Sequence, residues 1–418
     1  MDARTTQANS SPLAPARASL DTLVPTLRVG TPARPLRGSE PVEGCEPCFV
    51  RSKELQLLGS ARGTEVPHYE RETRQLTYSE AIREALEQEM ARDERVFVMG
   101  QGVDDFKGMY GTTKGLAERF GPERVFDTPL SEDAMTGVAI GAALAGLRPV
   151  HTHIRMDFLL LAMNQLVNLA AKSRFMYGGQ VNVPLVVRCV IGRSWGQGAQ
   201  HSQGLHSLFM HIPGLRVVAP TTPYDAKGLL IESLRDDNPV IFVEHRLCHF
   251  QRGDVPEELY TVPFDRSRIL AEGSDVTLVG ISHAAVECLR ARELLQAAGI
   301  AAEVIDPVSL SPFDVAGIAA SVRKTGRLVV VDSAWTFCGA SAEIVAAVGE
   351  ELQGERPFTF RRLGFAPVVC PTSKPLENLF YPNAQTIASA AFKLVDGGRD
   401  WQPGDAKAAE FEAFRGPF

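Results

Sequence analysis

Asp127-Thr-Pro-Leu-Ser-Glu-Asp-Ala-Met-Thr-Gly-Val-Ala-Ile-Gly-Ala-Ala-Leu-Ala-Gly146 is the most informative stretch of this 418-residue chain. It predicts an apolar helix over Glu132–Ala145, with Ser131 as the N-cap and with Gly146 and Pro149 ending the helix. The Glu132 carboxylate stands on the first turn of this helix. An acidic side chain there has an ordinary explanation, because it suits the helix dipole. A functional explanation depends on the rest of the chain.

Short apolar strands alternate with helices on both sides of this stretch. The predicted strands are Val96–Met99, Val125–Thr128, Pro149–Ile154, Pro184–Ile191, Leu215–Ala219 and Val240–Glu244. The predicted helices are Tyr78–Arg92, Glu132–Ala145, Phe158–Met176 and Tyr224–Asp236. Such alternation indicates a parallel sheet covered by helices on both faces.

A second α/β series follows a polar, proline-bearing link at Gln251–Arg266. Its predicted strands are Asp275–Ile281, Ala302–Asp306, Leu328–Asp332 and Phe358–Arg361, and its predicted helices are Ala284–Ala298, Pro312–Val322, Ala340–Glu351 and Leu376–Leu394. The sequence therefore predicts two doubly wound α/β domains, at residues 76–255 and 267–396, since 418 residues are too many for one core.

Residues 1–75 differ from the remainder, because seven prolines from Pro12 to Pro47 interrupt any regular helical or strand-like spacing of apolar residues. We interpret them as a disordered extension. Frequent Arg, Ser and Ala leave an organellar transit peptide as the alternative, although the prolines would break the amphipathic helix that such a peptide needs. Cys45-Glu-Pro-Cys48 is an isolated CxxC, which is weak support for a zinc or redox site.

Composition narrows the classes of function. A net charge of −7 and no basic stripe give no reason to expect nucleic-acid binding. No apolar run reaches the roughly 18–20 residues of a membrane span. Seven scattered cysteines fit a reducing compartment without a disulfide framework. We therefore expect a cytoplasmic protein, or one of an organellar matrix if the extension is a transit peptide.

The loop Gly192–Gly204 follows an apolar strand and holds four glycines among polar residues. Such a loop can bring backbone amides to a ligand and can present His201 for proton transfer, although a histidine there is often structural. His201, His206 and His211 are five residues apart, about 140° per step on a helix, so they do not converge on a metal. His151 and His153 share one face of a strand and are candidate pocket-lining residues, although a structural role is favoured.

Residues of about 76–396 resemble the β subunit of the thiamine diphosphate-dependent 2-oxo acid dehydrogenase E1 component, of the pyruvate and branched-chain type. The motifs that carry the resemblance are Arg124-Val-Phe-Asp-Thr-Pro-Leu-Ser-Glu132, Gly137–Pro149, Asn164–Lys172, Gln200-His-Ser-Gln203, Ile212–Pro220, Asp225–Leu230 and Arg235-Asp-Asp-Asn-Pro239. Their number and order make a chance match implausible. The resemblance implies a pyrimidine-binding transketolase-like domain followed by a transketolase C-terminal-like domain.

The family also implies roles for single residues. Glu132 matches the glutamate that hydrogen-bonds the aminopyrimidine of thiamine diphosphate and so activates the cofactor. Phe158 matches an aromatic residue that packs on this ring, with Leu130 and Met156 as neighbours. His201 matches a histidine of the active-site funnel, where it would transfer a proton or assist transfer to a lipoyl group.

Two further assignments concern ions. Asp236 and Asn238 match a loop that holds a monovalent cation, K⁺, in relatives, and the ordinary alternative is a turn. The superfamily holds the diphosphate and Mg²⁺ with Gly-Asp-Gly and a later Asn, and this chain has no Gly-Asp-Gly. The resemblance therefore implies a separate α subunit that binds the metal, an α2β2 assembly, and a lipoyl-bearing acyltransferase E2 as a further partner.

Two segments depart from the family pattern. His151-Thr-His-Ile-Arg-Met-Asp157 and Cys189-Val-Ile-Gly-Arg-Ser-Trp-Gly196 replace segments that line the substrate side, so the identity of the 2-oxo acid stays open. The expected activity is oxidative decarboxylation of a 2-oxo acid with acyl transfer to lipoamide. A carboligase or ketol-transfer enzyme that uses the same cofactor is the first alternative, and a scaffold that has kept the fold is the second.

Overall fold

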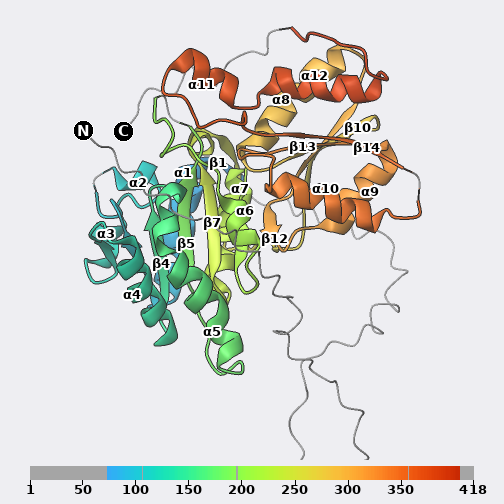
Figure 1. Cartoon of the computed structure of the whole chain (residues 1–418). Coiled ribbons are helices and arrows are strands. Elements are labelled where there is room, and N and C mark those ends of the chain that lie inside the picture. The colour runs from blue at the N-terminus through green and yellow to red at the C-terminus, as the bar shows by residue number, and fades with distance from the viewer. Residues whose placement is uncertain (1–72, 106, 194–195, 356, 405–418) are drawn as a thin grey trace, which may run out of the picture. The chain divides into compact units, whose positions relative to one another are not determined.

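The computed structural model describes residues 73–404 except 106, 194–195 and 356, and these residues form two large sheets and one small one (Figure 1). The first large sheet has seven strands in the order β12-β6-β7-β5-β4-β2-β3. Their bounds are β2 Val96–Gly100, β3 Val125–Asp127, β4 Arg148–His153, β5 Val186–Ile191, β6 Arg216–Val218, β7 Val240–His245 and β12 Ser309–Ser311. All neighbours pair in parallel except β12, which runs antiparallel to β6.

Alternating side chains of the central strands build a core on each face of this sheet. In β7, Val240 and Phe242 belong to a cluster with α1 and α7, whereas Ile241 and Val243 belong to a cluster with α4. The helical segments around this sheet are α1 Tyr78–Arg92, α2 Gly108–Gly111, α3 Leu116–Phe120, α4 Glu132–Leu144, η3 Met156–Ala162, η4 Gln165–Ala170, α5 Ala171–Met176, α6 His206–Met210, α7 Pro223–Arg235 and η5 Arg246–Phe250.

The second large sheet has five strands in the order β14-β13-β10-β11-β9, with β9 antiparallel at the edge. Its strands are β9 Arg268–Ala271, β10 Val276–Gly280, β11 Ala302–Asp306, β13 Arg327–Val331 and β14 Thr359–Leu363. Its helices are α8 His283–Ala297, α9 Val315–Thr325, α10 Ala340–Glu351, α11 Lys374–Phe380 and α12 Ala384–Val395. Helices α8 and α12 pack together on one face, and α9 and α10 pack on the other (Figure 1). The two doubly wound α/β units agree with the fold class that the sequence predicts.

The structure differs from the predicted division of the chain in two places. Residues 73–75, predicted within the extension, belong to β1 Thr73–Thr77, which pairs with β8 Arg252–Pro256 from the predicted link. Strand β12 comes from the second half of the chain yet completes the edge of the first sheet. Local patterns do not reveal such long-range pairing. The CxxC at residues 45–48 and the rest of the predicted extension lie outside the described residues.

Two predicted helices are divided in the structure. The segment predicted as helix 158–176 is a 3₁₀ helix, a π helix and a short α helix in succession, η3, η4 and α5. Apolar spacing cannot separate these helix types, because each repeats every three to four residues or slightly more. The helix predicted over 376–394 breaks between α11 and α12, because Pro382 lacks an N–H and disfavours helical backbone at Tyr381.

Helix α4 begins at the predicted residue, Glu132, and ends at Leu144, one residue before the predicted end. Gly146 has φ +95°, its N–H bonds to Ala143 O at 3.0 Å, and the Leu147 N–H bonds to Ala142 O at 3.0 Å. These two bonds form the glycine-terminated cap that the sequence predicts. Ser131 occupies the N-cap position, but its side chain makes no capping hydrogen bond. Across the part of the chain that the structure describes, no helix is both long and apolar enough for a membrane crossing.

Candidate active site

Three of the predicted site residues follow the carboxyl ends of parallel strands. Glu132 begins α4 just after β3, Phe158 lies in η3 just after β4, and His201 lies in the loop that follows β5. The carboxyl ends of parallel strands share one edge of the sheet, which is where open α/β sheets bind ligands. The topology therefore brings these three residues to one edge.

Glu132 is partly exposed and contacts a neighbouring side chain. Its Oε1 accepts a hydrogen bond from Gln101 Nε2 at 3.2 Å. Gln101 follows β2 directly, so it reaches the same edge of the sheet. The sequence reasoning missed Gln101, and its position after a buried strand is the signal that could have identified it.

Phe158 and His201 are direct neighbours. Their ring centroids are 5.2 Å apart with the planes at 72°, an edge-to-face contact, and both residues are partly exposed. Asp157 fixes the loop that carries His201, because its Oδ1 accepts hydrogen bonds from the backbone N–H and the side-chain amide of Gln203 at 3.2 and 2.9 Å. Burial raises the pKa of Asp157, and the bonds from Gln203 oppose that shift.

Leu130 and Met156 lie in contrasting surroundings. Leu130 is 80% exposed, two residues before Glu132, so its side chain offers an apolar surface at the rim of the site. Met156 is completely buried, and its sulfur accepts a hydrogen bond from Leu205 N at 3.3 Å. Met156 therefore supports the edge of the sheet from within the core.

A buried charge cluster lies on β5 and β7, and the sequence reasoning did not identify it. Arg188 donates to both carboxylate oxygens of Glu244 at 2.7 and 2.9 Å, and His249 Nε2 lies 3.1 Å from Glu244 Oε2. Burial alone would raise the pKa of Glu244, but Arg188 and His249 outweigh it and lower this pKa to about 2. The sequence did contain a signal for this cluster, which is one charged residue in each of two otherwise apolar strands.

His151 and His153 are both buried, which is compatible with the structural role that the sequence reasoning favours. Each is 2% exposed, and their ring centroids are 4.3 Å apart. Burial lowers the pKa of His151 to about 4 and moves the pKa of His153 in the same direction. His206 is also buried, with its Nε2 3.1 Å from Asp332 Oδ2.

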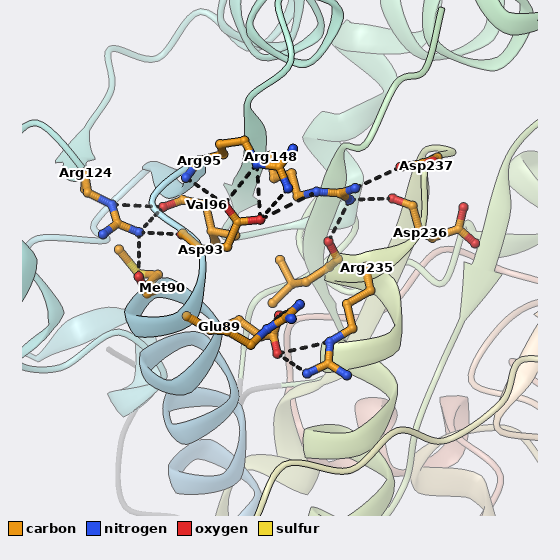
Figure 2. Close-up of polar contacts among 12 residues, drawn as sticks. Glu89, Met90, Asp93, Arg95, Val96, Arg124, Arg148, Arg235, Asp236 and Asp237 are labelled. Atoms are coloured by element: carbon orange, nitrogen blue, oxygen red, sulfur yellow. Dashed lines mark hydrogen bonds and ion pairs between the residues drawn. The ribbon is translucent and has the colours of Figure 1, made fainter.

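Asp236 and Asn238 lie away from Glu132, because their loop precedes β7 at the amino edge of the sheet. Figure 2 shows how this loop is held: Arg148 donates to Asp236 O at 3.0 Å and to Asp237 Oδ1 at 2.8 Å. The Asp236 carboxylate lies 2.7 Å from Arg216 Nε and also accepts from the Asn238 N–H and side-chain amide, each at 2.7 Å. A cation bound by these side chains would have to displace such bonds, and the K⁺ assignment stays a prediction.

The described residues fit the aminopyrimidine half of thiamine diphosphate. A carboxylate at Glu132, an aromatic ring at Phe158 and an apolar rim at Leu130 match the hydrogen-bonding groups and the flat face of an aminopyrimidine. Among residues 73–404, apart from the few positions left out, no group of three or more His, Cys, Asp or Glu side chains is placed to hold a metal ion.

Comparison with known proteins identifies two domains in the chain. Residues 74–248 match the transketolase pyrimidine binding domain, and residues 265–387 match the transketolase C-terminal domain. The structure resembles a split-gene transketolase, an inactive β4 tetramer, with a TM-score of 0.65 at 23% identity over 78% of this chain and all of that one. At that identity the likeness concerns the fold alone.

Curated relatives cover most of the chain. The β subunit of acetoin:2,6-dichlorophenolindophenol oxidoreductase from Cupriavidus necator is 42% identical over 78% of this chain and 99% of its own length. The pyruvate dehydrogenase E1 β subunit from Rickettsia bellii is 42% identical over 77% and 98%, and the mitochondrial β-1 subunit from Arabidopsis thaliana is 41% identical over 76% and 89%. With this identity along nearly the full length of these relatives, the chain belongs to the family of 2-oxo acid dehydrogenase E1 component β subunits.

Proposed function

We propose that this chain is the β subunit of a thiamine diphosphate-dependent enzyme that decarboxylates a 2-oxo acid oxidatively and passes the acyl group to lipoamide. The observation that carries the proposal is the Glu132 carboxylate, which accepts a hydrogen bond from Gln101 at the same edge of the sheet where Phe158 and His201 lie in contact. Relatives of this length and identity are named for pyruvate and for acetoin, so family membership does not select the substrate.

Each residue of the edge has a defined task. Glu132 would hold a ring nitrogen of the aminopyrimidine and share a proton with it, while Gln101 orients the carboxylate. Phe158 would pack on the ring, Leu130 would cover its rim, and Met156 supports the edge from below. When bound, thiamine diphosphate supplies the nucleophilic carbon to which the 2-oxo acid adds before CO₂ leaves. His201 would move a proton at the substrate or assist acyl transfer.

The partners are inferred from the family to which the chain belongs. A separate α subunit would hold the diphosphate and its Mg²⁺, so the active site would lie between subunits in an α2β2 assembly. A lipoyl-bearing acyltransferase E2 would accept the acyl group, and K⁺ at the 236–238 loop would have a structural role. The compartment would be the cytoplasm, or an organellar matrix if residues 1–75 are a transit peptide.

The test is a panel of 2-oxo acids assayed with the co-expressed α and β chains, thiamine diphosphate and Mg²⁺, with and without a lipoyl domain. We expect CO₂ release together with acylation of the lipoyl domain, and the preferred acid identifies the substrate. Release that ignores the lipoyl domain but responds to an aldehyde or ketone would instead establish a carboligase. A stable complex that releases no CO₂ from any acid would overturn the proposal.

A further inference from the structure

Arg155 is a buried cation next to the candidate active site. It lies between β4 and η3, three residues before Phe158, and it is 6% exposed. Its Nη2 donates a hydrogen bond to Gln197 Oε1. Within the part of the chain that the structure describes, its Nε and Nη1 have no hydrogen-bond partner. A buried guanidinium with unmade hydrogen bonds is costly and uncommon, so these two nitrogens point to a ligand that accepts from them.

Three segments that follow parallel strands meet at Arg155. Gln197 belongs to the loop after β5, which also carries His201. Tyr110 lies in α2, which follows β2. Burial raises the pKa of Tyr110, and the nearby charge of Arg155 opposes that shift. Since β2, β4 and β5 run parallel, Arg155 lies at the edge of the sheet that carries the candidate active site.

Asp157 is the acidic side chain closest to Arg155 along the chain, and the two do not hydrogen-bond to each other. Asp157 Oδ1 accepts two hydrogen bonds from Gln203, and its Oδ2 has no partner among the described residues. Burial raises the pKa of Asp157, and the bonds from Gln203 lower it more than the charge of Arg155 does. The Asp157 carboxylate is therefore directed to Gln203, and it leaves Nε and Nη1 of Arg155 to another acceptor.

Gln197 gives a ligand a way to reach the guanidinium. Its side chain is partly exposed, whereas Arg155 lies beneath it. Gly196 and Gly198 flank Gln197 with φ of +75° and +68°. Glycines on both sides allow this residue to change conformation at little cost. An acceptor that arrives from the surface can therefore replace the amide oxygen of Gln197 on Arg155.

The carboxylate that reacts is a poor partner for such a cation. It leaves as neutral CO₂, so an ion pair with a buried arginine would stabilise the substrate more than the transition state and would slow the reaction. A carboxylate at the other end of the substrate keeps its charge throughout. An ion pair with that group would select the substrate without opposing the chemistry. The guanidinium is planar and always charged, which suits a carboxylate.

We propose that Arg155 binds a second carboxylate of the substrate, so that the enzyme prefers a dicarboxylic 2-oxo acid. Nε and Nη1 supply the donors, and Gln197 gives up its place on the guanidinium. The inference takes the reaction from the proposed function. Pyruvate and acetoin, for which two relatives are named, carry no second carboxylate, so this preference would distinguish the present chain from both.

The first test is CO₂ release by the αβ complex from acids that are matched in length. 2-Oxoglutarate is compared with 2-oxopentanoate, and 2-oxoadipate with 2-oxohexanoate, because the members of each pair differ in the terminal carboxylate. We expect kcat/KM to be at least tenfold higher for the dicarboxylate in one pair or both. Arg155→Met should reduce this ratio at least tenfold, mainly through the KM of the dicarboxylate. Arg323→Met, in an exposed ion pair with Glu355, should leave the ratio unchanged.

The second test measures recognition without turnover, by calorimetric titration of the same acids into the Glu132→Gln complex. The preferred dicarboxylate should bind at least tenfold more tightly than its partner, and the addition of Arg155→Met should abolish the difference. If the wild-type complex releases no CO₂ from any acid but this binding preference is present, the proposed reaction fails and the role of Arg155 stands.

Three results would overturn the role of Arg155. They are equal affinity for both members of each pair, an unchanged ratio in Arg155→Met, and loss of α association in Arg155→Met, which would assign the guanidinium to the contact between subunits. If Arg155→Met fails to fold, the comparison of the paired acids in the Glu132→Gln complex still decides.

Discussion

Gln101 is the residue that most directly controls the geometry of Glu132, because its side-chain amide donates a hydrogen bond to that carboxylate. A hydrogen bond to a charged group contributes about 1.5–3 kcal/mol, or roughly a tenfold to hundredfold effect on a rate. Gln101→Met keeps the length of the side chain and removes the donor. We expect kcat of the αβ complex to fall within that range, whereas Gln88→Met, which removes a bond to Glu257 O, should have no effect. Equal kcat in both variants would contradict the role given to Gln101.

His201 lies against Phe158 and is held through the contact of Gln203 with Asp157. We expect His201→Ala to reduce acylation of the lipoyl domain more than it reduces CO₂ release, since its proposed task is proton movement around acyl transfer. Separate assays of the two steps provide the measurement. A variant that loses decarboxylation while acyl transfer from a preformed acyl donor stays intact would show that the role is misassigned.

Asp306 makes stability depend on pH. Burial, with the nearby charge of Asp225, raises the pKa of Asp306 from 3.8 to about 7. A raised pKa in the folded state means that stability is fully present below the unfolded value and is lost as pH rises through the folded value. At pH values above 7, the shift lowers the free energy of unfolding by on the order of 4 kcal/mol, because each pKa unit corresponds to about 1.4 kcal/mol.

Asp306→Asn removes the ionisable group and should therefore raise Tm more at pH 8 than at pH 5. The amide also keeps an acceptor for the Val308 N–H, which lies 2.9 Å from Asp306 Oδ1. Thermal unfolding of both proteins at the two pH values measures this difference. An equal change in Tm at both values would contradict the raised pKa.

At the scale of elements, the sequence predicts helix ends better than helix interiors. Capping residues act locally, so the glycine that ends α4 could be identified from sequence, whereas the change of helix type along residues 156–176 could not. The break at Pro382 could also have been predicted, since proline disfavours helix at the residue before it. Strand β12 could not, because its partner β6 lies about ninety residues away in the chain and no turn connects them.

Two glycines of the α4 region provide a matched pair for stability. Gly146 has φ +95°, and Gly141 lies in the helix, with no atom within 4 Å of an added Cβ at either site. Gly146→Ala should lower the free energy of unfolding of the β chain by about 1–2 kcal/mol, because left-handed backbone is costly for alanine. Gly141→Ala should raise it by about 0.5–1 kcal/mol. Urea titration measures both, and the same sign for both variants would contradict the assignment of the cap.

At the scale of the whole chain, one hydrophobic core connects the two large sheets. The cluster that contains Ile241 of β7 also contains Ile305 of β11 and Ile344 of α10, and β12 extends the first sheet. We therefore expect differential scanning calorimetry of the full-length chain to show a single cooperative transition. Two well-separated transitions would contradict this coupling.

Glu132, Phe158 and His201, which the sequence motifs single out, each follow the end of a parallel strand and so lie at one edge of the sheet. The motifs gave no indication of Gln101 or of the pair Arg188 and Glu244. These contacts depend on strand order and on packing between distant segments, and a local pattern contains neither.

The central claim is that Glu132 performs the proton chemistry of a thiamine-dependent decarboxylation. The most direct measurement is turnover of the preferred 2-oxo acid by the αβ complex with Glu132→Gln and with Glu132→Ala. We predict that each variant loses at least about a hundredfold in kcat, the range of general acid–base catalysis, while the circular dichroism spectrum and α association stay unchanged. Substantial turnover in both variants would contradict the claim.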